Sequence, residues 1–149
     1  MPSARPPTPP SGLVKALYAL GLGPMVGRLV LLLITTGRKT GLRRITALQY
    51  EEIDGAIYVA SSRGQEADWF RNVVANPRVE VKVKSRRFCG IGETTTDPKR
   101  IADFLEVRLR RHPKMIGSIL RWEGLPAEPS RAQLEEYAAK LALVVIRPE

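Results

Sequence analysis

The hydrophobic pattern of the chain contains three stretches that predict strands. Val79, Val81 and Val83 alternate with charged side chains, which predicts a strand with one buried face. Leu29–Thr35 and Leu141–Arg147 are instead apolar almost throughout. A short apolar run bounded by turn residues indicates a strand that is buried on both faces. These stretches therefore predict a sheet with an enclosed core.

Turn residues separate the other expected strands. One strand is expected from Arg44 to about Ile53, and Asp54-Gly55 after it is a pair favoured in two-residue hairpins. Ala56–Ser62 supplies the returning strand. A further strand is expected at Arg87–Thr94, where two glycines suggest a bulge or a tight bend. Hairpins therefore join most of the strands, and about six mostly antiparallel strands are expected.

Apolar residues at helical spacing predict helices between and after these strands. Trp69 and Phe70 lie on such a stretch, which ends before an Asn-Pro pair. Ser130 with Gln133 resembles a capping box, in which each residue satisfies a free amide of the other at a helix start. Helices are expected at about 11–20, 65–75, 97–111, 114–122 and 130–140.

Together these elements predict an α+β fold, with a mostly antiparallel, barrel-like sheet and flanking helices. A chain of 149 residues is long enough to form one domain with its own core. Residues 1–10 contain five prolines and few apolar side chains, so they are expected to be a disordered tail. The domain is therefore expected at 11–149.

Charge is distributed unevenly along the chain. The formal net charge is +9, and residues 1–50 carry seven lysines and arginines and no acidic residue. Such a region attracts anionic ligands, nucleic acid or an acidic membrane surface, and charge alone does not choose among them.

Cys89 is the single cysteine of the chain, so a reducing compartment is expected. The apolar window at 13–34 is interrupted by charges, glycines and a proline. We therefore expect a cytoplasmic protein, with peripheral membrane contact left open.

The turn after the first apolar strand concentrates the basic residues. Thr35–Gly41 contains two glycines that permit a backbone bend, together with threonine hydroxyls, Arg38 and Lys39. Arg43 and Arg44 follow directly. Backbone amides, hydroxyls and guanidinium groups together suit a phosphate or a polycarboxylate, because arginine binds such anions bidentately. A solvated basic hairpin tip is the alternative interpretation.

Three motifs follow one another along the chain: Ile34–Gly41 with Arg44, then Val59–Gly64, then Trp69–Asn72 leading into Ala75–Pro77. In this order they resemble the deazaflavin-dependent nitroreductase family, which uses coenzyme F420. The resemblance covers about residues 29–83. It implies a split β-barrel, F420 as cofactor and hydride transfer from the reduced deazaflavin. F420 carries a phosphodiester and a polyglutamate tail, and a basic turn suits both groups.

The resemblance also implies a set of cofactor-binding residues. In the basic turn and the next strand these are Arg38, Lys39, Thr40, Arg44, Ile45, Thr46, Ala47, Leu48 and Gln49, and further along the chain Ala60, Ser61, Ser62, Arg63, Trp69 and Asn72. Three of them also have a purely structural interpretation. Trp69 can belong to the core, Asn72 can satisfy a neighbouring backbone group, and Arg63 can lie in a solvated turn.

An acceptor pocket is expected beside the deazaflavin. Its implied residues are Ser62, His112, Met115 and Ser118. His112, Met115 and Ser118 take the places of tyrosines found in nitroimidazole-reducing relatives, which puts nitroimidazole reduction in doubt. A quinone or an activated alkene is the expected acceptor. No catalytic nucleophile and no metal site are expected.

Two other classes of function remain open. A non-catalytic split barrel that binds a cofactor or a lipid, or a relative that uses FMN, has the same pattern of elements. A nucleic-acid-binding barrel is not expected, because the chain has no aromatic RNA-binding signature. The expected partner is a small-molecule acceptor, and the oligomeric state, monomer or homodimer, is left open.

Overall fold

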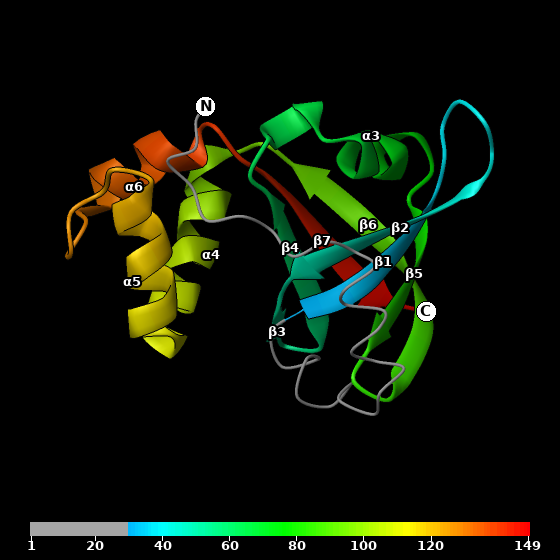
Figure 1. Ribbon diagram of the computed structural model, residues 1–149, viewed down its shortest axis with the longest axis horizontal. Helices are drawn as coiled ribbons and strands as arrows, with labels where there is room; N and C mark the ends of the chain where they lie inside the picture. The colour runs from blue at the N-terminus through cyan, green and yellow to red at the C-terminus, as the bar shows by residue number, and fades with distance from the viewer. Residues whose placement is uncertain (1–29) are drawn as a thin grey trace.

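The computed structural model of the protein describes residues 30–149. The tail expected at 1–10 and the helix expected at 11–20 lie outside the described residues and stay predictions. The strands run in the order β2-β1-β5-β6-β7-β4-β3, and every neighbouring pair is antiparallel (Figure 1). Their bounds are Val30–Thr36 (β1), Arg43–Gln49 (β2), Glu51–Ile53 (β3), Ala56–Ser61 (β4), Arg78–Val83 (β5), Arg86–Thr95 (β6) and Ala142–Pro148 (β7).

Tyr50 closes the sheet into a barrel. It is the single residue between β2 and β3, and these two strands lie at opposite ends of the strand order. Two peptide units span at most about 7.6 Å between Cα atoms, so the two edges of the sheet must approach each other here. The described part of the chain therefore has seven strands rather than about six, because the stretch expected as one strand from Arg44 to Ile53 divides at Tyr50.

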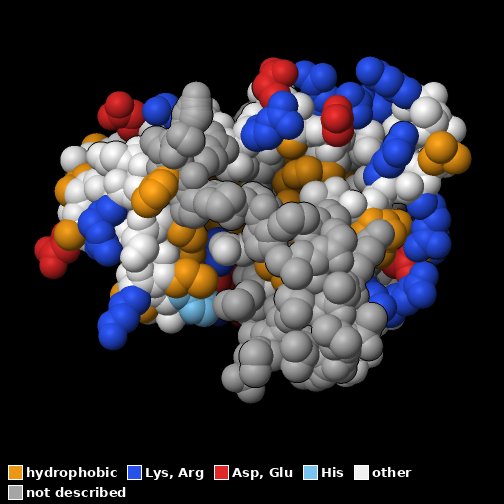
Figure 2. All heavy atoms as spheres, in the orientation of Figure 1, with side chains coloured by type: hydrophobic (Ala, Val, Ile, Leu, Met, Phe, Trp, Pro, Cys, Tyr) orange, Lys and Arg blue, Asp and Glu red, His pale blue; other side chains and the backbone are white. Residues whose placement is uncertain are grey.

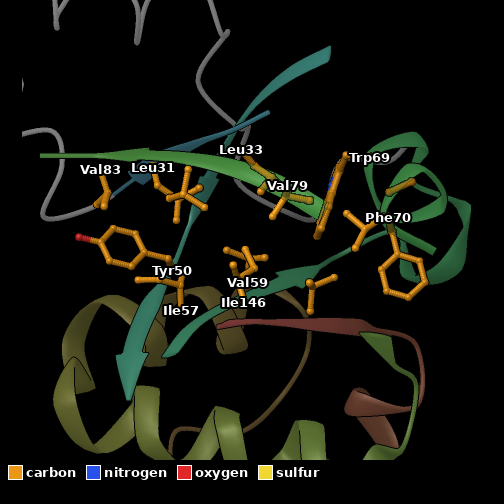
Figure 3. Packing of buried hydrophobic residues seen from close by; sticks show 14 of the residues in the cluster. Leu31, Leu33, Tyr50, Ile57, Val59, Trp69, Phe70, Val79, Val83 and Ile146 are labelled. Carbon is orange, nitrogen blue, oxygen red and sulfur yellow. The ribbon is translucent and has the colours of Figure 1, made fainter. Parts of the chain in front are cut away.

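The barrel interior is filled by one apolar cluster. Val79, Val81 and Val83 are 3%, 0% and 0% exposed, which confirms the one-sided strand that their spacing predicts. Tyr50 points into the same cluster, and Figure 3 shows it beside side chains of β1 and β4. β1 and β7 are buried along nearly their whole length, as their continuous apolar runs predict.

Three helices form a second layer outside the barrel. They are α4 (Pro98–Arg111), α5 (Pro113–Trp122) and α6 (Arg131–Ala138), and they pack against the outward side chains of β4 and β7 (Figure 1). Asp97 accepts a hydrogen bond from the backbone N of Lys99 at 3.0 Å at the start of α4. Both hydrogen bonds of the Ser130–Gln133 capping box are present, which confirms that prediction.

One shorter helix covers an end of the barrel. It was expected to be continuous over 65–75, but a 3-10 turn (η2, Gly64–Glu66) precedes an α-helix (α3, Asp68–Ala75). Ala67 between them is extended, with ψ 132°, so the helical hydrogen bonding cannot run through it. Trp69 and Phe70 of α3 pack into the barrel cluster (Figure 3).

Glycines have two different roles in the turns and strands. The hairpin at Asp54-Gly55 is confirmed, with positive φ of 51° and 81° at the two residues, as a type I′ turn requires. Of the bulge or tight bend expected at Gly90 and Gly92, the bulge is wrong, since the register of β6 with both neighbours is unbroken. A Cβ at Gly90 would lie 2.8 Å from the backbone O of Arg147, so close approach of the strands explains this glycine.

This close approach predicts opposite effects for two glycine substitutions. Gly90→Ala should lower the free energy of unfolding by about 1–3 kcal/mol, because the methyl group meets backbone atoms that cannot move aside. Gly117→Ala in α5 is the matched control. Its Cβ would meet only the end of the Arg121 side chain, at 3.4 Å. Alanine there should raise stability by up to about 1 kcal/mol. Urea unfolding of both variants measures the difference, and equal effects would contradict the packing explanation.

Candidate functional site

The loop between β1 and β2 is held by its own backbone. The N–H of Gly37 donates to the O of Leu42 at 2.7 Å, and the N–H of Gly41 donates to the O of Gly37 at 2.8 Å. Gly41 has φ +72°, a conformation that glycine adopts without strain. The side-chain oxygen of Thr40 accepts a further bond from the N–H of Leu42 at 3.2 Å. These contacts form a compact loop that projects from the barrel (Figure 1).

Strand register decides which basic side chains of this loop face the barrel. Arg44 pairs with Thr35, and Thr46 pairs with Leu33 of the barrel cluster. Directly paired residues share one face of an antiparallel sheet, so Arg44 and Thr46 lie on the concave face. Arg43 is the neighbour of Arg44 and lies on the opposite face, where it forms an ion pair of 2.9 Å with Glu80.

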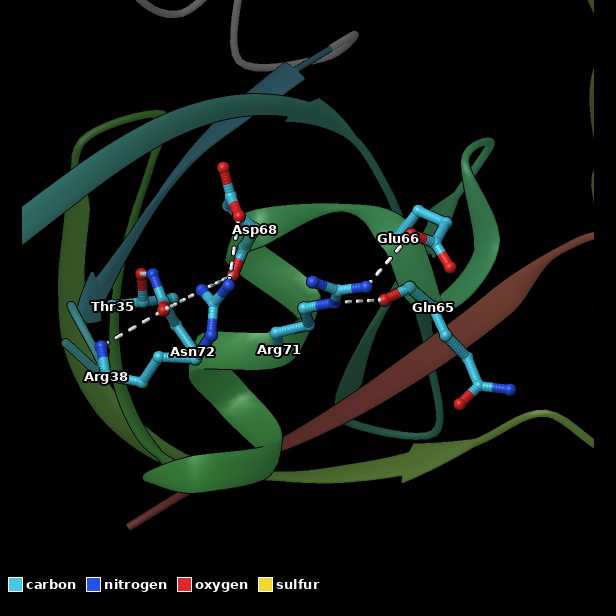
Figure 4. Close-up of polar contacts among 7 residues, drawn as sticks. All are labelled: Thr35, Arg38, Gln65, Glu66, Asp68, Arg71 and Asn72. Atoms are coloured by element: carbon cyan, nitrogen blue, oxygen red, sulfur yellow. Dashed lines mark hydrogen bonds and ion pairs between the residues drawn. The ribbon is translucent and has the colours of Figure 1, made fainter.

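Arg38 ties the loop to α3. Its Nη1 donates to Oδ1 of Asn72 at 2.9 Å and to the backbone O of Asp68 at 3.4 Å. Its Nη2 donates to Oδ1 of Asp68 at 3.1 Å. Figure 4 shows the guanidinium between these two residues of the helix. The hydrogen bond and charge of Arg38 hold the pKa of the Asp68 carboxyl below its usual value. Arg38 is therefore already engaged by protein groups.

Asn72 is the buried polar residue at the centre of these contacts. It is 3% exposed, and its Oδ1 accepts hydrogen bonds from both the side chain and the backbone N of Arg38, the latter at 3.1 Å. Its Nδ2 donates to Oγ1 of Thr35 at 3.3 Å. A buried amide needs partners for both its ends, and these three bonds provide them. One side chain thus joins the end of β1, the loop of residues 37–42 (the basic loop) and α3.

A cavity of about 590 Å³ opens between the loop, β2 and α3. This volume lies within the range typical of small-molecule sites. The cavity is lined by Gly37, Arg38, Lys39, Thr40, Arg43, Arg44, Ile45, Thr46, Asp68, Trp69 and Asn72. We call it the basic cavity. The side chains of Lys39 and Arg44 are exposed in it and form no hydrogen bond or ion pair with another residue of the range 30–149. These two cations are therefore available to an anionic ligand.

The basic cavity contains one part of the predicted cofactor-binding set. These residues are Arg38, Lys39, Thr40, Arg44, Ile45, Thr46, Trp69 and Asn72. Gly37, Arg43 and Asp68 line it as well and were missed. Arg43 could have been included from its place in the basic turn. Nothing in the local sequence signals Asp68, since its contact with Arg38 joins residues 30 positions apart.

The remaining residues of the set lie outside the basic cavity. Ala47 packs against Val30 and Leu32 on the outer face of the sheet, and Leu48 packs against the barrel cluster. Gln49 accepts hydrogen bonds from Arg108 of α4 at 3.3 Å. These three residues continue along β2, away from the loop.

The four predicted cofactor-binding residues at 60–63 also lie outside the basic cavity. Ala60 packs against the cluster beneath α4–α6, and the hydroxyl of Ser61 donates to the O of Gly64 at 2.8 Å. Ser62 and Arg63 are exposed. None of these four residues lines the basic cavity.

The three predicted acceptor residues on the helices are gathered near the junction of α4 and α5. His112 lies 2.9 Å from the buried carboxylate of Glu51 through its Nε2. Met115 packs partly buried against the helical cluster, and Ser118 accepts a hydrogen bond from Arg121 at 3.3 Å. None of these three residues lines the basic cavity.

Among residues 30–149, no three histidine, cysteine or acidic side chains lie close enough together to hold a metal ion. No helix within that range is long and apolar enough to span a bilayer.

Comparison with known proteins identifies the family. The family model described as F420H(2)-dependent quinone reductase matches residues 18–114, more than half of the chain. The chain therefore belongs to the F420H(2)-dependent quinone reductase family, which confirms the resemblance found in its motifs. One relative is an F420H(2)-dependent quinone reductase of Mycobacterium tuberculosis strain H37Rv, 41% identical over 61 residues. That match covers 39% of this chain and 41% of the relative, so the chain spans about two fifths of the length of this curated relative.

Solved structures bear out the fold. An F420-H2 dependent reductase has a TM-score of 0.54 at 20% identity, covering 80% of this chain and 95% of that one. HutZ, a heme storage protein from Vibrio cholerae, has a TM-score of 0.56 at 14% identity, covering 93% and 89% of the two chains. At such identities the likeness concerns the fold alone. The α+β split barrel is thus confirmed, and proteins with different functions share it.

The contacts of Asn72 predict that its substitution destabilises the loop between β1 and β2. Asn72→Ala should lower the free energy of unfolding by about 1–3 kcal/mol, since it leaves the backbone N of Arg38 and the Thr35 hydroxyl without partners. Asn72→Asp keeps an acceptor for Arg38, and the Thr35 hydroxyl can turn to donate to it, so this variant should lose less. Thermal unfolding compares the two, and equal losses would contradict the role assigned to the Asn72 oxygen.

Proposed function

We propose that this protein binds coenzyme F420 through the basic cavity and uses the reduced cofactor to reduce a quinone. One observation carries the proposal beyond family membership. In a cavity between the loop and α3, the side chains of Lys39 and Arg44 form no hydrogen bond or ion pair within residues 30–149. F420 carries a phosphodiester and carboxylates, which are the groups that such cations bind.

The residues of the basic cavity fit the anionic part of this cofactor. The guanidinium of Arg44 can donate two parallel hydrogen bonds to a phosphate, and the ammonium of Lys39 adds a point charge. The Thr40 oxygen accepts from Leu42, so its hydroxyl hydrogen is available to a ligand oxygen. Trp69 adds an aromatic wall and is held by its packing in the barrel core. The deazaflavin would lie further along β2, in the direction of Thr46 to Gln49.

Arg38 and Asn72 have a different role in this proposal. Their side chains hold the loop against α3 and so position Lys39 and Arg44, while Arg38 adds its own charge as a secondary contact to the ligand. Preorganised donors lose little entropy when they bind, which raises affinity.

The bound deazaflavin supplies the hydride, so the chain needs neither a covalent nucleophile nor a metal for this reaction. The work of the protein is to bind the cofactor, aim it and shape a place for the acceptor. We place the acceptor near Ser62, His112, Met115 and Ser118. Ile119 is partly buried like Met115 and adds apolar surface, which suits a flat conjugated acceptor such as a quinone or an activated alkene, whereas Ile116 is buried in the helical cluster.

The competing function is ligand binding without reduction, or use of FMN. The fold of a heme storage protein supports keeping this alternative, because it shows that such barrels hold ligands for other purposes. FMN carries a phosphate but no polyglutamate tail, so it would form fewer contacts with the cations of the loop.

A spectrophotometric assay tests the proposed function. Protein saturated with F420H2 should oxidise it in the presence of quinones, and its activity on nitroimidazoles should be weak or absent. Met115→Tyr should change the order of preferred acceptors more than it changes the affinity for F420. A fluorescence titration should give tighter binding of F420 than of FMN. No acceptor-dependent oxidation, together with tight binding, would favour the ligand-binding alternative.

Replacing Lys39 or Arg44 should weaken the binding of F420 without slowing turnover at saturation. Lys39→Ala and Arg44→Ala should each raise the dissociation constant for F420 about ten- to hundredfold, the value of a hydrogen bond to a charged group. Turnover at saturation should change little. Arg44→Lys should also weaken binding, because lysine cannot reproduce the planar fork.

The control for these variants is Lys114→Ala, which removes an exposed charge of α5 outside the basic cavity. Its affinity for F420 should stay close to that of the wild type. Unchanged affinity in the Lys39 and Arg44 variants would move the cofactor site elsewhere.

A further inference from the structure

Asp68 brings a negative charge into a cavity that is otherwise basic. Among the described lining residues it alone is acidic, while the four other charged ones are Arg38, Lys39, Arg43 and Arg44. Its side chain is 84% exposed, whereas that of its partner Arg38 is 20% exposed. An anionic ligand in this cavity would therefore meet the Asp68 carboxylate directly.

Asp68 is ionised at neutral pH and occupies one edge of the Arg38 guanidinium. The pKa of its carboxyl is lowered, chiefly by the hydrogen bond from Arg38. Nη2 of Arg38 lies 3.1 Å from Oδ1 of Asp68, while Nη1 is held independently by Asn72 at 2.9 Å. Arg38 would thus remain anchored to α3 by Asn72 even without the acidic partner.

We propose that Asp68 is a counter-anion of the basic cavity, which competes with the anionic cofactor for Arg38 and lowers the affinity for it. This inference rests on the proposed function, since it concerns the same site. An exposed carboxylate can rotate away from Arg38, whereas the anchored guanidinium stays in place for a phosphate or carboxylate of the ligand. Asp68 therefore acts as a determinant of affinity, and in the free protein it compensates the charge of Arg38.

A structural role for Asp68 predicts a different outcome. Asp68 lies in the first turn of α3, where a negative charge interacts favourably with the helix dipole. If this were its whole contribution, neutralising it would lower stability and would leave ligand affinity equal or weaker. Competition instead predicts that stability falls while affinity rises. The two measurements together separate the explanations.

The test compares Asp68→Asn with Glu66→Gln in F420 titrations. Glu66 is the matched control, because it is an exposed acid paired with Arg71 at 2.9 Å and it does not line the cavity. Asp68→Asn should bind F420 about two- to fivefold more tightly than the wild type, the range expected for an exposed charge interaction. The gain should shrink at high salt, and Glu66→Gln should show a smaller one. A deazaflavin nucleoside without phosphate or tail should bind wild type and Asp68→Asn equally.

Equal or weaker F420 binding by Asp68→Asn would overturn the inference while leaving the proposed function in place. An equal gain in Glu66→Gln would also overturn it, because the effect would then reflect net charge alone. If the wild type does not bind F420 at all, the proposed function fails. Titration with inorganic pyrophosphate then decides about Asp68: tighter binding by Asp68→Asn supports the competition, and equal or weaker binding overturns it.

Discussion

The amide of Asn72 is the contact on which the geometry of the candidate site depends. It is buried, and it joins Thr35 at the end of β1 to the backbone and the side chain of Arg38 (Figure 4). A buried amide without partners is costly, so the loop is strongly favoured in the one position that satisfies it. Strand register then turns Arg44 toward the concave face, and the loop's own hydrogen bonds present Lys39. A single buried group thus links the barrel core to the charges at the surface.

Barrel closure and the cation site are arranged along the same strand. β2 begins at the basic loop and ends at Tyr50, where the two edges of the sheet meet. Beyond this point Glu51 is buried among Arg108, Arg111 and His112 of the helical layer. Figure 2 shows basic side chains concentrated on the same side of the molecule as the loop. In the proposed site, one end of β2 would provide cations for an anionic tail, and the other end approaches the helices where we place the acceptor.

Local patterns explain which features could be predicted. The valine alternation, the Asp54-Gly55 hairpin, the capping box and the basic turn all depend on residues within a few positions of one another. The division of β2 from β3 could not be read locally, because it depends on which distant strands pair on either side of Tyr50. The same applies to Gly90, whose close contact is with Arg147, and to Asp68, whose partner Arg38 lies in another element. The predicted cofactor-binding residues stay a prediction, and strand pairing and packing decide which of them line the basic cavity.

We propose that F420 binds in the basic cavity. Hydrogen–deuterium exchange of the protein with and without F420 tests it most directly. We predict slower amide exchange at residues 37–46 and 68–72 when F420 is present, with little change at residues 84–85 in the turn between β5 and β6. Protection confined to other segments, such as 108–122, would contradict the assignment of the site.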